Sequence, residues 1–163
     1  MSNKNSLLDI LMIFGAEYVI YIAFALIFVL AFKEGVRERK TLILASLSIP
    51  ILIIIIKIIH LFLYQPRPFI SHEILPLISY TRVDASFPSR HTALMFVLAF
   101  SYFFYKSKWR FYFLIAATWV GISRIYVGVH YPLDILGGVV TGVIAVWIAW
   151  IIKGKLKSRL SLN

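Results

Sequence analysis

The chain has 163 residues, of which 61% are hydrophobic and only 15% are charged, and it contains no cysteine. A soluble domain is nearer half apolar and a quarter charged, so this composition indicates a membrane protein. The lack of cysteine excludes disulfides, thiolate metal sites and cysteine nucleophiles. The net charge of +10 could suit a nucleic-acid-binding protein, but most basic residues lie in short segments between apolar stretches. That placement argues against a nucleic acid partner.

Five apolar segments follow one another along the chain, and their lengths suit membrane-spanning helices. They cover residues 7–32, 41–64, 92–105, 111–129 and 133–152. A helix of about 20 residues crosses a hydrocarbon core of roughly 30 Å, and lipid cannot satisfy the open backbone of other structures. The third segment is short, so we expect its helix to begin near Ser89 or to lie recessed. The predicted fold is therefore all-α, an integral membrane bundle of about five transmembrane helices, in a single domain over residues 1–163.

Three basic segments predict the orientation in the membrane. They are KEGVRERK at 33–40, KSKWR at 106–110 and KGKLKSR at 153–159, and a five-span chain places all three on one side. By the positive-inside rule that side is cytoplasmic. We therefore expect the amino terminus and the loop at 65–91 on the outer face and the carboxyl terminus in the cytoplasm. The first apolar segment is too long for a cleavable signal peptide, so none is predicted.

Three polar stretches that are distant in sequence meet at the predicted outer face. They are HLFLYQPRP at 60–68, PSRH at 88–91 and SRIYVGVHYPLD at 123–134. Together they bring arginines, histidines and an aspartate to one depth. Such a set suits an anion, because the arginines repel a metal cation. We therefore expect the active site at this outer face, with neither a metal nor another cofactor.

Residues in the first two stretches are candidate ligands of a phosphate group. Pro66 and Pro68 hold the backbone of Arg67 extended. The guanidinium of Arg67 offers a planar fork to two phosphate oxygens. Ser89 follows a proline and is expected to cap the next helix, which would direct the free amides of the first turn at an anion.

The third stretch carries a histidine and a carboxylate four residues apart, His130 and Asp134. A carboxylate at this spacing can accept a hydrogen bond from one imidazole nitrogen and leave the other nitrogen free to attack. We therefore interpret His130 as a nucleophile and Asp134 as the residue that orients it. His91 would then be the general acid that protonates the leaving group.

These stretches resemble the signature of the type 2 phosphatidic acid phosphatase superfamily, which reads K-x6-R-P, then P-S-G-H, then S-R-x5-H-x3-D. The matching positions are, in chain order, Arg67 and Pro68, then Pro88, Ser89 and His91, then Ser123, Arg124, His130 and Asp134. The resemblance implies a phosphohistidine mechanism without metal, in which Arg67 and Arg124 hold the phosphate oxygens. It also implies hydrolysis of a lipid phosphate or diphosphate at the membrane surface.

Two positions depart from this signature. His60 stands where the first block has lysine, and Lys57 lies one helical turn deeper. Either His60 replaces the lysine and binds phosphate as a pH-dependent ligand, as we hypothesise, or Lys57 reaches past it to the phosphate. The alternative to phosphate binding by Lys57 is a buried ion pair with Glu17. Arg90 stands where the second block has glycine. It either extends to lipid headgroups or, as we prefer, contacts a second phosphate.

The sequence therefore predicts an integral membrane lipid phosphatase whose partner is its membrane lipid phosphate substrate. The added arginine makes a polyprenyl diphosphate such as undecaprenyl diphosphate the first candidate, followed by phosphatidylglycerophosphate, phosphatidate and phosphorylated lipid A. A vanadate-dependent peroxidase-like enzyme is one alternative, since the haloperoxidases share the fold of this superfamily. A non-catalytic protein that binds lipid phosphates is another, because the motif lysine is missing.

Other polar and small residues are given structural interpretations. The outer-loop residues His72, Glu73, Arg82 and Asp84 are expected to be solvated rather than catalytic. The rest of this loop is apolar enough to lie along the membrane surface. The last apolar segment carries Gly137, Gly138 and Gly142, which predict close packing of its helix against a neighbour.

Overall fold

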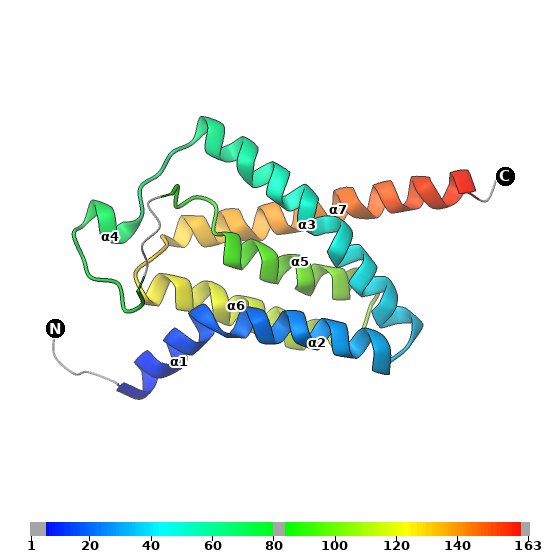
Figure 1. Ribbon diagram of the computed structural model, residues 1–163, viewed down its shortest axis with the longest axis horizontal. Coiled ribbons are helices and arrows are strands. Elements are labelled where there is room, and N and C mark those ends of the chain that lie inside the picture. The colour runs from blue at the N-terminus through cyan, green and yellow to red at the C-terminus, as the bar shows by residue number, and fades with distance from the viewer. Residues whose placement is uncertain (1–5, 80–83, 161–163) are drawn as a thin grey trace.

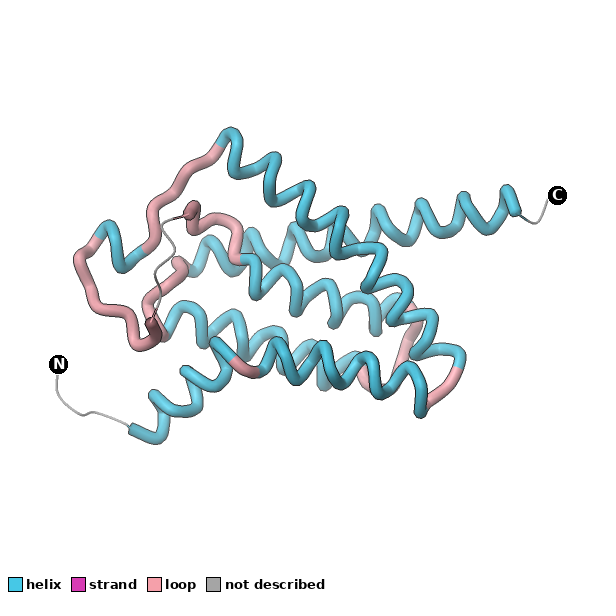
Figure 2. Tube along the Cα trace, in the orientation of Figure 1, coloured by secondary structure: helices cyan, strands magenta, loops and turns pink. Residues whose placement is uncertain are grey.

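A computed structural model describes residues 6–79 and 84–160 of the chain. Within these residues the regular elements are all α-helices (Figures 1 and 2). In chain order they are α1 (Ser6–Glu17), α2 (Val19–Lys33), α3 (Val36–Phe62), α4 (Pro68–Ser71), α5 (Arg90–Phe104), α6 (Arg110–Tyr126) and α7 (Pro132–Leu160). The predicted all-α fold is confirmed.

The first apolar segment forms two helices instead of the single helix that we expected. α1 and α2 meet at an angle of 52° around Tyr18. A break of this kind leaves backbone carbonyls without their usual partners in the helix. One carbonyl at the break, that of Ala16, accepts a hydrogen bond from Arg124 of α6 at 3.4 Å. The break therefore links α1 to a residue of the predicted site.

The short helix α5 lies at the centre of the bundle. It packs most extensively against α7 and α6, and it also contacts α3 and α2. Most of its 15 residues are buried, from Thr92 through Tyr102. A helix that is apolar on all sides is one that is buried all round. The shortness of α5 is therefore explained by its surroundings, because protein rather than lipid covers it.

The close approach of α7 to α5 depends on two glycines. A Cβ atom added to Gly138 would lie 2.8 Å from the carbonyl oxygen of Ser89. One added to Gly142 would lie 2.8 Å from the carbonyl oxygen of Ala93. The packing predicted from the glycines is thus confirmed. The close packing brings the beginnings of α5 and α7 together, and there the Ser89 amide donates to the Asp134 carbonyl at 3.0 Å.

The two ends of the bundle differ in their connections. The α2–α3 and α5–α6 connections and the end of α7 lie at one end, and the long connection that contains α4 lies at the other (Figure 1). The three basic segments therefore share one end. By length and composition, α3 and α7 can each cross a membrane, and the bent pair of α1 and α2 adds a third candidate span. The count of five spans stays a prediction, because α5 and α6 have 15 and 17 residues.

Candidate active site

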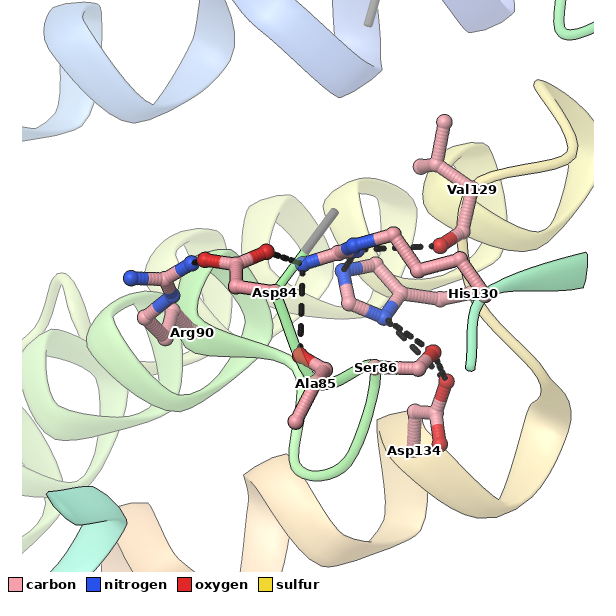
Figure 3. A network of polar contacts seen from close by, with 8 residues as sticks. Asp84, Ala85, Ser86, Arg90, Val129, His130 and Asp134 are labelled. Atoms are coloured by element: carbon pink, nitrogen blue, oxygen red, sulfur yellow. Dashed lines mark hydrogen bonds and ion pairs between the residues drawn. The ribbon is translucent and has the colours of Figure 1, made fainter. Parts of the chain in front are cut away.

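Four parts of the chain form a buried polar cluster at the end of the bundle opposite the basic segments. Arg67 comes from the connection after α3, and Ser86 comes from the connection before α5. His130 lies in the α6–α7 connection, and Asp134 lies in the first turn of α7. Figure 3 shows the contacts that join them. Two of the three stretches predicted to meet, 60–68 and 123–134, are joined by these contacts, and the Ser89 amide links the third, 88–91, to the Asp134 carbonyl.

His130 is hydrogen-bonded through both ring nitrogens. Its Nδ1 lies 3.2 Å from Oδ2 of Asp134, and its Nε2 lies 3.1 Å from Nη1 of Arg67. Because arginine can only donate, one tautomer satisfies both contacts, with the proton on Nδ1 and the lone pair on Nε2. Burial lowers the pKa of His130 to about 4, and Arg67 and Arg124 also lower it, whereas Asp134 acts in the opposite direction. The ring is therefore neutral at neutral pH and carries a nucleophilic nitrogen.

Asp134 is fully buried, and one of its oxygens receives several hydrogen bonds. Oδ2 accepts from the His130 ring, from the hydroxyl of Ser86 and from the backbone amide of Tyr131 at 2.8 Å. Ser86 is itself fully buried, and its hydroxyl lies 3.4 Å from Nδ1 of His130. The sequence analysis did not identify Ser86 as a site residue. The one feature that could have indicated it is its place in SFPSRHT, as a small polar residue just before the second block of the signature.

Arg67 is 1% exposed and holds its guanidinium in a network of acceptors. Nη1 donates to the Val129 carbonyl at 3.1 Å, and Nη2 donates to Oδ1 of Asp84 at 2.8 Å and to the Ala85 carbonyl at 3.4 Å. The other carboxylate oxygen of Asp84 pairs with Arg90. The expectation that Asp84 is merely solvated is wrong, because the loop folds back and places this carboxylate between two guanidinium groups.

The other outer-loop residues have different outcomes. His72 and Glu73 are exposed, as expected. Arg82 lies outside the described residues.

Arg124 of α6 is 2% exposed, and it lies close enough to His130 to influence the histidine electrostatically.

The first turn of α5 holds two predicted site residues. His91 makes no side-chain hydrogen bond to any residue that the structure describes, and it lies within electrostatic range of Arg124 and His130. Ser89 precedes α5 at the capping position, but its side chain makes no capping hydrogen bond. The hydroxyl of Thr92 donates to the Ser89 hydroxyl at 3.1 Å instead. The capping role predicted for the Ser89 side chain is therefore wrong, although α5 does begin directly after it.

A cavity of about 430 Å³ lies beside this cluster, between α2, α3 and α5. Three basic side chains line it, those of Lys57, His60 and Arg90. Its other lining residues are apolar: Phe24, Ile49, Leu52, Ile53, Ile56 and Leu94. Basic groups next to apolar walls suit a ligand with an anionic head and a hydrocarbon tail.

The cavity also settles one structural alternative. Lys57 is exposed in the cavity lining, and in the described part of the chain it forms no ion pair. The Glu17–Lys57 pair is therefore absent. Glu17 is the last residue of α1, and α1 packs against α6 rather than against α3, the helix that carries Lys57.

A comparison with family models identifies the superfamily of the chain. Residues 14–158 match the model of the PAP2 superfamily. The undecaprenyl-diphosphatase BcrC of Bacillus subtilis (strain 168) is 37% identical over 145 residues, which cover 88% of this chain and 74% of that relative.

Two solved structures are similar in fold. The crystal structure of Aquifex aeolicus LpxE superposes with a TM-score of 0.70 at 27% identity, covering 91% of this chain and 88% of that chain. The transmembrane PAP2 type phosphatidylglycerolphosphate phosphatase from Bacillus subtilis gives a TM-score of 0.58 at 21% identity, covering 94% and 80%. At that lower identity the second likeness concerns the fold alone.

Proposed function

The chain belongs to the PAP2 superfamily, and from this premise we propose that it hydrolyses a polyprenyl diphosphate, such as undecaprenyl diphosphate, through a phosphohistidine intermediate. At the coarser level it is a multi-pass membrane protein and a lipid phosphatase. The proposal rests above all on one observation. His130 is buried, with Nδ1 3.2 Å from Oδ2 of Asp134 and Nε2 3.1 Å from Nη1 of Arg67, and burial lowers its pKa to about 4, which favours the neutral ring.

The proposed reaction has two steps. Nε2 of His130 attacks the terminal phosphorus, an N–P bond forms, and the P–O bond to the leaving group breaks. His91 donates a proton to the departing oxygen, while Arg67 and Arg124 stabilise the charge on the oxygens of the transferred group. Water then cleaves the N–P bond, which releases inorganic phosphate and regenerates the histidine. Asp134 holds the ring throughout and stabilises its positive charge.

The preference for a diphosphate is supported by the surroundings of Arg90. This residue lines the cavity and pairs with the same carboxylate as Arg67, so a ligand at Arg67 has a second guanidinium within reach. His60 and Lys57 add basic groups to the same lining, and we propose that His60 takes the place of the motif lysine. The apolar walls would accommodate the start of a hydrocarbon chain. The Bacillus subtilis relative is named an undecaprenyl-diphosphatase, which agrees with this choice.

Phosphate release by the purified protein in detergent tests the proposal. The substrates to compare are undecaprenyl diphosphate, phosphatidylglycerophosphate, phosphatidate and lipid A. We expect the polyprenyl diphosphate to be preferred, His130→Ala to abolish release and Lys40→Ala, an exposed change at the opposite end, to leave it intact. Release that survives in His130→Ala would reject the phosphohistidine mechanism, and no release from any lipid would favour a binding protein.

Two further variants examine the departures from the signature. Arg90→Gly should impair the diphosphate substrate more than a monophosphate, and equal effects on both would reject a contact to the second phosphate. His60→Lys should shift the pH profile, because lysine stays charged where histidine titrates. An unchanged profile and unchanged activity would remove His60 from the site.

We also propose that the site faces outward. The basic segments share the opposite end of the bundle, and such segments favour the cytoplasm. The amino terminus would then lie outside and the carboxyl terminus inside.

A further inference from the structure

The carboxylate of Asp84 lies between two arginines at the candidate active site. Its Oδ1 is 2.8 Å from Nη2 of Arg67, and its Oδ2 is hydrogen-bonded to Nη2 of Arg90 (Figure 3). We call the pair Arg67 and Arg90 the two-arginine site. One carboxylate thus gives one oxygen to each guanidinium, which is the kind of contact that phosphate oxygens make with arginine.

We propose that Asp84 is an intramolecular competitor for the substrate's phosphate group. Its carboxylate fills the two-arginine site in the absence of phosphate, is displaced when a phosphate group binds and returns as the product phosphate leaves. This inference rests on the proposed function in one respect, because it takes Arg67 as a ligand of the phosphate.

Arg67 does not need Asp84 to hold its position. Its guanidinium also donates to the backbone carbonyls of Val129 and Ala85 and to the ring of His130. Two prolines restrict its backbone on either side. A carboxylate that served only as a brace would therefore duplicate contacts that are already present.

Exposure differs sharply between the two partners of this ion pair. The side chain of Asp84 is 34% exposed, whereas that of Arg67 is 1% exposed. Asp84 therefore approaches the guanidinium from the open side of the site. Its carboxylate can rotate into water and be solvated there, whereas the buried arginine cannot. The ion pair thus breaks by movement of the carboxylate.

The charges favour exchange of the carboxylate for phosphate. Two guanidinium groups and one carboxylate leave one positive charge unbalanced. A phosphate monoester carries a charge of about −1.5 to −2 at neutral pH, so it neutralises the site more fully than a carboxylate does. Every anion that binds must nevertheless first break the Asp84 contacts, so its apparent affinity is its intrinsic affinity multiplied by the fraction of molecules in which the site is open.

The consequence concerns product release. A lipid substrate also gains binding energy from its hydrocarbon chain, whereas inorganic phosphate gains none. When Asp84 weakens the phosphate contacts, the substrate still binds through its hydrocarbon chain, whereas inorganic phosphate loses its main source of affinity. Asp84 would keep released phosphate from inhibiting the enzyme.

Binding of inorganic phosphate to the purified full chain in detergent tests this inference by calorimetry. Asp84→Asn keeps the shape of the side chain and removes its charge. We expect it to bind phosphate roughly tenfold more tightly than the wild type, since a competing charge-assisted hydrogen bond is lost. Inhibition by product phosphate should strengthen by the same factor. Glu34→Gln is the matched control, because Glu34 pairs with Lys108 at 2.6 Å at the other end of the bundle, and its phosphate affinity should equal that of the wild type.

Unchanged or weaker phosphate binding in a folded Asp84→Asn protein would overturn the inference, because a structural brace predicts that result. Asp84→Ser is a second neutral variant, and thermal unfolding reports whether each variant is folded. If neither variant folds, Asp84 is a brace and the inference fails. Wild-type hydrolysis of undecaprenyl diphosphate separates this failure from that of the proposed function. Activity without tighter binding rejects only the role of Asp84, and tighter binding without activity rejects only the proposed function.

Discussion

His130 is a buried residue that lies between a carboxylate and a guanidinium. Its pKa is lowered from 6.5 to about 4, chiefly by burial. An unfolded chain therefore binds a proton before the folded chain does as the pH falls. The contribution of this group to stability is complete above about pH 6.5 and is lost progressively towards pH 4.

This lowered pKa leads to a prediction about protonation. We expect the ring of His130 to titrate near pH 4, and we expect the neutral, nucleophilic form to persist throughout the range from pH 5 to 8. NMR titration of histidine-labelled protein measures this, and the chain has only 4 histidines, so His130→Ala assigns the signal. Titration near 6.5 would contradict the buried geometry.

Ser86 offers a second prediction, because it positions Asp134 without a place in the reaction itself. Ser86→Ala removes one donor from Oδ2 of the buried carboxylate. The net value of such a hydrogen bond is about 0.5–1.5 kcal/mol, so we expect kcat to fall roughly two- to tenfold with little change in KM. Ser101→Ala is the control, since Ser101 is also buried and donates to the Val97 carbonyl at 2.7 Å, away from the site. Equal losses in both variants would indicate a general packing effect.

The sequence predicted contacts between residues that are close in the chain better than contacts across the loop. The pairing of His130 with Asp134 follows from a spacing of four residues at the start of a helix. The ion pair of Arg67 with Asp84 joins residues 17 positions apart, at the two ends of a connection that contains α4. No periodicity relates such residues, because the path of a loop depends on what packs beneath it.

Helix packing was predictable where small residues mark it and unpredictable elsewhere. The glycines of α7 indicated a close neighbour, and that neighbour is α5. The break between α1 and α2 has no such mark, since neither proline nor glycine stands at Tyr18. Breaks of this type are set by contacts with other helices, here including the contact of Ala16 with Arg124.

The approach of α7 to α5 gives a prediction for the helices. Gly138→Ala would bring a Cβ atom to 2.8 Å from the Ser89 carbonyl, where backbone cannot yield cheaply. Overpacking of this kind costs about 1–3 kcal/mol, so we expect a lower unfolding temperature in detergent and reduced activity. Gly154→Ala on the same helix is the control. Nothing lies within 4 Å of its added Cβ, so its stability should be unchanged or slightly higher. Equal effects of the two changes would contradict the tight contact.

On the scale of the whole molecule, the bundle separates its charges between two ends. The basic segments gather where α2 joins α3 and α5 joins α6, and the candidate active site lies at the opposite end. The separation was predictable because the sequence alternates basic connections with apolar segments. The number of membrane crossings was harder to predict. A central helix such as α5 is apolar because protein surrounds it, so its composition does not show that it crosses the membrane.

This polarity predicts which end of the bundle reaches the outside of the cell. The chain has no cysteine, so Ser71→Cys at the site end and Lys40→Cys at the basic end each introduce a single thiol at an exposed position. In intact cells that express the protein, a membrane-impermeant maleimide should label position 71 alone, and position 40 should react only after permeabilisation. Labelling in the reverse order would place the active site in the cytoplasm. The substrate would then have to present its phosphate groups on the inner leaflet, because the basic residues that hold them cannot cross the membrane to reach it.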